Sequence, residues 1–595
     1  MFALSRLALL LPLVALAALS AQADGPKDNL PDNVRPVPPV GIELPAADAE
    51  TIKAGLAELQ SEIKAIGRHD LLPDVAIYEQ AVRYAADYRE VFDAKGIPAV
   101  KKVLKDGLER AKALKAGQHP WTTQTGYVVR GYRSKIDGSP QPYGLHVPAG
   151  YKAKGESKHR LDFWWHGRGE TLSEVNFIAN QQNAGGIIPA PGAFILAPYG
   201  RYCNANKFAG EIDTLECLDH VKKHYRIDES RLVARGFSMG GAACWQFAVH
   251  YPTLWCANAP GAGFSETPEF LKVFQNEKVE PAWYEKKLWH MYNATDSAIN
   301  IFNLPTVAYS GEIDSQKQVA DVMAREMKKV GLELDHVIGP KTGHSYEKGA
   351  KAIVNQKIDA IVSRGKSPLP AEIKFATYTL RYNRCGWAEV TGLEKHWEKA
   401  EVSGTFDGTK YTIATKGVTG LVVHTPAELT VQIAIDGTSV SSVSRGGPGR
   451  LRLLKGADGK WSVPNPPPAG LAKKPGLQGP IDDAFMDRFI FVRPTGTAVN
   501  DKLAAWTQKE MAHAIDHWRK QFRGDAIVKD DKDITADDIK TSNLVLWGDL
   551  KSNLVMEKVA DKLPLKEFGD TTTTALIYPN PLNPKKYVVL NSGFT

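Results

Sequence analysis

The sequence predicts an α/β protein of several domains, of which the largest has a mainly parallel, doubly wound sheet. Three observations lead to this fold class. Strand-like and helical runs alternate over residues 122–364, as in sheets whose strands are joined by crossover helices. The residues before that stretch have a helical period, and those after it form short β-rich runs followed by a second α/β pattern. At roughly 150 residues per domain, a chain of 595 residues fits this division.

The composition is that of an ordinary globular chain, and it excludes several classes of protein. Apolar residues make up 43% and charged residues 24%, which excludes disordered and fibrous proteins. The 74 Lys and Arg exceed the 67 Asp and Glu by 7 without forming basic runs, so no nucleic-acid partner is expected. The five cysteines lack metal-ligand spacing, and phosphate-binding glycine motifs are missing. We therefore expect no metal, nucleotide or other cofactor.

Residues 1–23 have the pattern of a secretory signal peptide. Arg6 supplies a positive charge, residues 7–19 are almost entirely apolar, and Ala21-Gln22-Ala23 gives a small-x-small cleavage site. About 13 apolar residues are too few to cross ~30 Å of hydrocarbon, and no later stretch is long enough to do so. We expect a cleaved signal peptide, a secreted or periplasmic location and no membrane span.

Residues 24–121 are predicted to form a helical N-terminal region. An arm rich in Pro and Asp comes first, and from Ala47 to about Gly117 apolar side chains such as Leu56 and Leu59 recur at helical spacing. A helical region of this length is too short for a β-propeller or a repeat array.

Residues 122–364 carry the alternating pattern of strands and helices. The expected strands are 161–165, 193–197, 232–235, 256–259, 306–309 and 334–338. The expected helices between them include 208–224, 239–250 and 316–330. Parallel strands need crossover connections, so we expect helices on both faces of this sheet.

Three segments follow the alternating region. Residues 365–463 contain short β-rich runs punctuated by Gly and Asp, which predict a small all-β module. Residues 464–480 contain six prolines and are predicted to form a stiff linker. Residues 481–595 return to an α/β pattern. The chain stops at Thr595 directly after a predicted strand, which fits a natural terminus and a truncated sequence equally well.

Gly236-Phe237-Ser238-Met239-Gly240 matches the G-x-S-x-G pattern of a serine nucleophile. Strand-like residues precede it and helix-compatible residues follow. The sharp strand-to-helix turn needs glycines beside the serine, because larger side chains would clash there. The turn presents the hydroxyl at the positive end of a helix. We interpret Ser238 as a nucleophile.

A serine hydroxyl needs a base that takes its proton and an acid that orients the base. His344 lies in a Gly-rich loop after the last strand of the region, and we interpret it as the base. Asp314, at the carboxyl end of the strand 306–309, is the expected acid, with Glu312 as the competing candidate. The order Ser238, Asp314, His344 is that of the α/β-hydrolase fold.

The turn His166-Gly167-Arg168-Gly169 follows an early strand and predicts an oxyanion hole. The backbone N–H groups of Gly167 and Arg168 can converge with that of Met239 on a developing negative charge.

These motifs together resemble the catalytic domain of the prolyl oligopeptidase family and its dienelactone-hydrolase and carboxylesterase relatives. The resemblance covers residues 122–364. It implies an α/β-hydrolase fold and a Ser-Asp-His hydrolase of esters or peptides. True oligopeptidases also carry a large β-propeller, which residues 24–121 cannot supply, so propeller gating is not expected and the choice between ester and peptide substrates stays open.

Substrate contacts are predicted from position alone. An insertion at about 265–303 is rich in aromatic residues, and Trp283 and Trp289 are candidates for lining a lid. Packing without ligand contact is the alternative for this insertion. Arg201 and Tyr202, which follow a predicted strand, are candidates for the rim of the pocket.

The sequence thus predicts a secreted serine hydrolase that acts on a small ester or peptide substrate through an acyl-enzyme. Two alternatives stay open. One is a carboxylesterase or carbohydrate esterase without peptidase activity, and the other is a non-catalytic surface- or carbohydrate-binding protein. Cys203 and Cys217 could pair as a disulfide outside the cytoplasm. The oligomeric state and the roles of the two C-terminal modules are not predicted.

Overall fold

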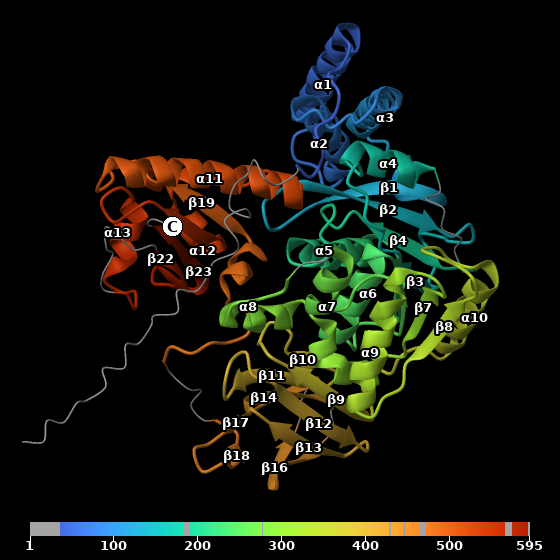
Figure 1. Ribbon diagram of the computed structural model, residues 1–595, viewed down its shortest axis with the longest axis vertical. Helices are drawn as coiled ribbons and strands as arrows, with labels where there is room; N and C mark the ends of the chain where they lie inside the picture. Colours follow the sequence, from blue (N-terminus) through green and yellow to red (C-terminus); the bar gives the residue numbers. More distant parts are fainter. Residues whose placement is uncertain are drawn as a thin grey trace, which may run out of the picture.

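A computed structural model describes residues 36–183, 190–275, 278–427, 430–443, 448–464, 470–565 and 574–592. The predicted signal peptide lies outside these residues. Among the residues described, no helix has the length and apolar character that crossing a bilayer requires. Figure 1 shows a central α/β unit with N-terminal helices at one end, an all-β module at the other and a second α/β module to one side.

The N-terminal region forms three helices, α1 (Ala46–Ile66), α2 (Pro73–Asp87) and α3 (Ile97–Lys115). Helix α2 is buried along most of its length because it lies against strand β1 (Gly126–Arg133). The approach is so close that a Cβ on Gly131 would come within 2.4 Å of the Pro73 carbonyl oxygen. A buried ion pair with 2.9 Å between Arg130 Nε and Asp74 Oδ1 fixes this contact.

The central sheet has eight strands in the order β1-β2-β4-β3-β5-β6-β7-β8. β1 pairs antiparallel with β2, and β2 with β4, whereas the pairs from β4-β3 to β7-β8 are parallel. The prediction of a mainly parallel sheet is confirmed. The strands after β1 are β2 (Pro140–Val147), β3 (His159–Phe163), β4 (Phe194–Pro198), β5 (Ile227–Phe237), β6 (Ala257–Gly261), β7 (Val307–Gly311) and β8 (Asp335–Gly339).

Helices cover both faces of this sheet, as predicted. Successive residues of a strand point to opposite faces, and so Val233 of β5 packs with α10 while Ala234 lies in the core that contains α6. The helices of the central unit, including α7 and α8 of the insertion, are α4 (Glu174–Gln182), α5 (Ala209–His224), α6 (Met239–His250), α7 (Pro268–Phe270), α8 (Trp283–Leu288), α9 (Gln318–Lys329) and α10 (Lys348–Arg364).

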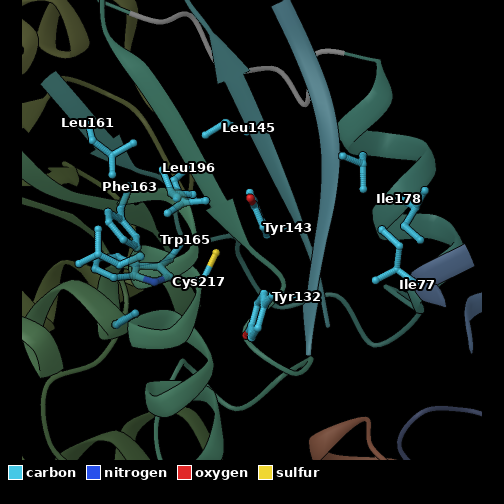
Figure 2. Close-up of a cluster of buried hydrophobic side chains, with 14 of the residues drawn as sticks. Ile77, Tyr132, Tyr143, Leu145, Leu161, Phe163, Trp165, Ile178, Leu196 and Cys217 are labelled. Carbon is cyan, nitrogen blue, oxygen red and sulfur yellow. The ribbon is translucent and has the colours of Figure 1, made fainter. Parts of the chain in front are cut away.

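The antiparallel end of the sheet is also covered on both sides. Figure 2 shows Ile77 and Ile178, from α2 and α4, on one side of the β1–β2 ribbon and Tyr132, Tyr143 and Cys217 on the other. The N-terminal helices therefore replace water on a sheet face that would otherwise be exposed.

The all-β module consists of two five-stranded sheets that share one apolar core. Side chains alternate between core and solvent, as in β13, where Tyr411 and Ile413 are buried and Thr412 is exposed. The strands are β9 (Glu372–Thr377), β10 (Arg384–Cys385), β11 (Ala388–Leu393), β12 (Ala400–Phe406), β13 (Lys410–Lys416), β14 (Val418–Ala427), β15 (Thr430–Ile435), β16 (Thr438–Val443), β17 (Pro448–Lys455) and β18 (Trp461–Ser462).

The C-terminal module is a second α/β unit with the strand order β20-β19-β21-β23-β22. Its central strands are apolar on both faces, since Phe491 packs with α11 and Val492 packs with α13. The elements are β19 (Phe489–Arg493), α11 (Asp501–Phe522), β20 (Val528–Asp530), α12 (Ala536–Thr541), β21 (Asn543–Trp547), α13 (Leu554–Ala560), β22 (Thr574–Asn580) and β23 (Asn583–Ser592).

Arg523, the residue after α11, joins this module to the rest of the protein. Its guanidinium is fully buried and binds the carboxylates of Glu90 and Glu174, with 3.0 Å from Nη1 to Glu90 Oε1 and 2.8 Å from Nε to Glu174 Oε1. Its carbonyl oxygen accepts a hydrogen bond of 2.8 Å from Gln141 Nε2. One side chain thus connects the N-terminal helices, α4 and the C-terminal module.

We expect Arg523→Met to destabilise the protein by about 3–5 kcal/mol, because it leaves the buried Glu174 carboxylate without its cation and leaves Glu90 with only the 3.3 Å contact to Arg519. Urea unfolding followed by fluorescence would measure the change. Arg83→Met is the matched control, since Arg83 pairs with the half-exposed Asp525, and such a pair is worth about 0–1 kcal/mol. Equal unfolding midpoints for the two variants would contradict the role of Arg523.

Candidate active site

Ser238 lies in the turn between β5 and α6, in a strained left-handed conformation with φ 59° and ψ −122°. The glycines around it allow this turn. A Cβ on Gly236 would lie 2.4 Å from the carbonyl oxygen of Gly240, and one on Gly240 would lie 2.0 Å from that of Trp165. As the residue that precedes the first turn of α6, Ser238 stands at the positive end of the helix dipole.

His344 and Asp314 form a hydrogen-bonded pair. The distance from His344 Nδ1 to Asp314 Oδ2 is 2.8 Å. The Asp314 side chain is 2% exposed, and its Oδ1 accepts a hydrogen bond of 2.9 Å from the Gln316 backbone N–H. Glu312, the competing candidate, is exposed and accepts a bond of 2.6 Å from the Lys341 N–H. The structure thus brings Asp314 to the histidine.

Close packing at the ends of β7 and β8 holds this pair in place. A Cβ on Gly311 would lie 2.2 Å from the Gly343 carbonyl oxygen, so only glycine lets the two loops touch. The Tyr309 hydroxyl donates to the Ser345 carbonyl and accepts from the Glu347 N–H, both at 2.8 Å. The loop that carries the histidine is therefore tied to β7 on both sides of Ser345.

The histidine lies beside the serine turn. The ring of Phe237, the residue before Ser238, is 4.9 Å from the His344 ring. Among the described residues, the Ser238 hydroxyl makes no hydrogen bond with His344. Such bonds are often long in unliganded enzymes and tighten when substrate binds. The contact with Phe237 therefore places the His344–Asp314 pair next to the turn that carries Ser238.

The predicted oxyanion turn lies against the serine. A Cβ on Gly167 would lie 3.5 Å from Ser238 Cβ, and the His166 ring nitrogens lie 2.8 Å and 2.9 Å from the carbonyl oxygens of Gly167 and Tyr199. The N–H of Met239, in the first turn of α6, has no intrahelical partner. The Arg168 side chain turns outward to Glu170, at 2.6 Å. Only its backbone can therefore serve an oxyanion hole.

A cavity of about 370 Å³ adjoins this turn, which is within the size range of small-molecule sites. It is lined by Gly167, Arg168, Gly169, Thr171, Leu172, Asn176 and Asn180. Because the lining begins at the predicted oxyanion turn, the cavity can hold part of a substrate bound at Ser238.

The prediction that Arg201 and Tyr202 form the pocket rim is wrong. Arg201 is fully buried, and its Nη1 lies 2.9 Å from Oδ2 of Asp137. Tyr202 is 1% exposed, and its hydroxyl donates to the Glu170 carbonyl oxygen. Distant parts of the chain cover this strand end, among them Trp518 of α11, whose indole N–H also binds Asp137. Both side chains hold the fold together.

Among the described residues, no hydrogen bond or ring contact connects Trp283 or Trp289 with Ser238 or His344. Trp283 is 71% exposed, and its ring packs edge-on against Tyr284. Trp289 begins a 3₁₀ turn that ends at Met291, and within this turn the His290 ring stacks on Tyr378 of the all-β module, with 4.0 Å between the ring centroids. Much of the insertion thus packs between the central unit and the all-β module, which is the alternative role, packing without ligand contact, given for it in the sequence analysis.

Two residues near the serine were missed by the sequence analysis, namely Phe264 and Lys207. Phe264 packs against the buried cluster of Ala205, Met239 and Ala242, and the Lys207 ammonium lies 5.0 Å from the Phe264 ring centroid. Neither residue belongs to a recognisable motif. The position of Phe264 just after the strand beside the nucleophile was the one available signal.

The described residues contain no group of three or more His, Cys, Asp or Glu side chains arranged to hold a metal ion. All five cysteines are free, and so Cys203 and Cys217 do not form a disulfide in this structure.

Fold and site together define an α/β-hydrolase of the serine hydrolase class. Residues 204–360 match the model of the prolyl oligopeptidase family, which confirms the resemblance found in the sequence. A search of curated proteins finds no significant match.

Solved structures similar to this chain include esterases and peptidases. A ferulic acid esterase is 17% identical, with 40% of this chain and 99% of that chain covered and a TM-score of 0.31. An S-formylglutathione hydrolase from Agrobacterium tumefaciens is 16% identical, with coverages of 40% and 95% and a TM-score of 0.31. A dipeptidyl peptidase 4 from Porphyromonas gingivalis is 12% identical, with coverages of 41% and 36% and a TM-score of 0.31. The chain thus spans about a third of that peptidase's length.

Proposed function

We propose that this protein is an exported serine hydrolase that cleaves small esters, and short peptides more slowly, through an acyl-enzyme. The observation that carries the proposal is the His344–Asp314 pair at 2.8 Å beside the strained serine turn. The family match of residues 204–360 supports it. The signal-like residues 1–23 are the basis for export.

In this mechanism Ser238 Oγ attacks the substrate carbonyl carbon while His344 Nε2 accepts the hydroxyl proton. The oxyanion is stabilised by the N–H groups of Met239, Gly167 and Arg168. The C–O or C–N bond then breaks, and the proton passes from His344 to the leaving group. Water repeats these steps on the acyl-enzyme and releases the acid. Asp314 keeps the Nδ1 proton facing its carboxylate and stabilises the imidazolium.

Esters, and aryl esters above all, are the favoured substrates because their leaving groups need less help from a proton than an amine does. An amide nitrogen is a poor leaving group until His344 protonates it, so peptide cleavage depends more strongly on the geometry of that proton transfer. Among the residues described before the sheet, the three α-helices α1, α2 and α3 do not form the gating chamber of a propeller enzyme. Specificity must therefore come from groups close to Ser238.

We expect p-nitrophenyl acetate and butyrate to be hydrolysed with a higher kcat/KM than Xaa-Pro or Xaa-Ala p-nitroanilides. Both substrate types release a chromophore, so one assay compares them directly. A fluorophosphonate probe should label Ser238 in the same preparation, which a non-catalytic binding protein would not permit. Faster turnover of the anilides would identify a peptidase, and lack of labelling would contradict the serine hydrolase mechanism.

A further inference from the structure

Lys207 is a cation close to the candidate nucleophile that the proposed mechanism does not use. It lies in the turn between β4 and α5. Its ammonium donates a hydrogen bond of 2.7 Å to the Tyr292 carbonyl oxygen and lies 5.0 Å and 5.8 Å from the ring centroids of Phe264 and Tyr292. The ammonium therefore lies beside an aromatic wall, formed by the rings of Phe264 and Tyr292.

The surroundings of Lys207 place it next to the reacting serine. Phe264, whose ring faces the ammonium, packs against a small buried cluster of Ala205, Met239 and Ala242, and Met239 is the residue after Ser238. The preceding residue, Gly263, lies so close to the nucleophile turn that a Cβ there would be 2.6 Å from the Ser238 carbonyl oxygen. The ammonium thus lies over a ring that belongs to the segment packed against the serine turn.

The turn that carries Lys207 is held rigidly. Ala205, Asn206 and Phe208 all have positive φ angles, of 55°, 51° and 56°. Such strain persists only where the surrounding structure enforces it, and it is common at functional sites. Asn206 is fully buried, and its Oδ1 accepts a hydrogen bond of 3.0 Å from the Thr214 hydroxyl. The lysine backbone is therefore fixed before any ligand arrives.

Lys207 lacks a counter-ion among the described residues. Glu211 and Glu266 are the carboxylates whose charges act on the pKa of Lys207. Both already accept hydrogen bonds from other groups. Glu211 accepts hydrogen bonds from the hydroxyls of Tyr251 and Tyr382, at 2.7 Å and 2.8 Å. Glu266 accepts from the backbone N–H groups of Glu269 and Phe270. An ammonium has three donors, and the contact with Tyr292 uses one of them.

Burial lowers the pKa of Lys207 to about 8, as expected for an ammonium removed from water without a paired anion. The group is still mainly protonated at neutral pH. An anion bound there would recover the electrostatic energy that desolvation removes.

We propose that Lys207 binds a carboxylate on the substrate, so that the esters preferred by Ser238 carry a negative charge close to the scissile bond. This inference rests on the proposed hydrolase function. A carboxylate fits better than a phosphate, because two free N–H donors suit two carboxylate oxygens. A dianion would need more donors than one ammonium supplies, and it would face the Tyr292 carbonyl oxygen.

The test uses two matched pairs of esters, so that the charge is placed on either side of the bond. The acyl-side pair is 4-nitrophenyl glutarate and its methyl ester, and the leaving-group pair is 4-acetoxybenzoate and its methyl ester. We expect the wild type to favour the anionic member of at least one pair. In Lys207→Met, kcat/KM for that anionic ester should fall by about tenfold to hundredfold, mainly through KM, as for a lost charge-assisted hydrogen bond.

The neutral esters are the internal control, and Lys207→Met should change their turnover little because methionine keeps the apolar stem. Lys207→Arg should restore part of the anionic preference. Lys223→Met, an exposed lysine near the far end of α5, should leave both pairs unchanged. No anionic preference in the wild type, or equal losses on charged and neutral esters, would overturn the inference. Neutral turnover that depends on Ser238 would still support the hydrolase function.

Discussion

Ser238→Ala is expected to abolish ester hydrolysis while the protein stays folded. The alanine lacks the attacking oxygen, and loss of a serine nucleophile typically lowers kcat by about 10⁶. Folding should be preserved because the turn depends on the neighbouring glycines, and the Ser238 side chain forms no hydrogen bond among the described residues. Hydrolysis of p-nitrophenyl acetate and circular dichroism would measure the two effects.

Ser345→Ala is the matched control for this prediction. Ser345 is an exposed serine next to His344, and its contribution to the loop is its carbonyl oxygen, which the substitution keeps. Its turnover should therefore stay close to that of the wild type. A folded Ser238→Ala protein that still hydrolyses the ester, or a Ser345→Ala protein that does not, would move the nucleophile away from Ser238.

The central fold and the grouping of Ser238, Asp314 and His344 could be predicted because their signals are local in the chain. Each residue follows an apolar strand, and the carboxyl ends of parallel strands meet at one edge of the sheet. Choosing between Asp314 and Glu312 needed the structure, because the two are separated by one residue. The backbone N–H groups of Gln316 and Lys341 decide which carboxylate faces the histidine.

The antiparallel strands β1 and β2 were not predicted, because several of their buried residues are polar and interrupt the apolar pattern of a buried strand. Arg130 and Gln141 are fully buried there. Each is hydrogen-bonded to a partner far away in the chain, Asp74 in the first case and the Arg523 carbonyl in the second. A pattern based on apolar residues cannot detect strands of this kind.

The prediction that Arg201 lines the rim of the pocket was wrong for a related reason. Arg201 stands at a strand end, where substrate-binding residues are common, but Asp137 and the end of α11 enclose it. That helix begins some 300 residues later in the chain, at Asp501. Long-range packing decides whether such a side chain meets substrate or protein, and the sequence around it does not record that packing.

Asp314→Asn is expected to lower kcat on the order of 10⁴, because the variant holds His344 in the wrong tautomer. The structure explains why the side-chain amide of this variant cannot rotate to place its oxygen toward His344. Oδ1 of Asp314 accepts the Gln316 N–H at 2.9 Å, so the amide oxygen must stay there and the amide nitrogen must face His344. An NH₂ group at the position of Oδ2 can only donate to Nδ1. The proton is then forced onto Nε2, which can no longer accept one from Ser238.

Glu312→Gln tests the competing carboxylate, and it should lower kcat little. Glu312 is exposed, and the glutamine can still accept the Lys341 N–H that Oε2 accepts at 2.6 Å. Burst kinetics on p-nitrophenyl acetate would show where Asp314→Asn acts. A slow burst means that the transfer of the Ser238 proton is impaired, as the tautomer argument requires. A fast burst with slow steady-state turnover would mean that only deacylation depends on Asp314. A larger loss in Glu312→Gln than in Asp314→Asn would assign the orienting role to Glu312 and require the loop after β7 to rearrange when substrate binds.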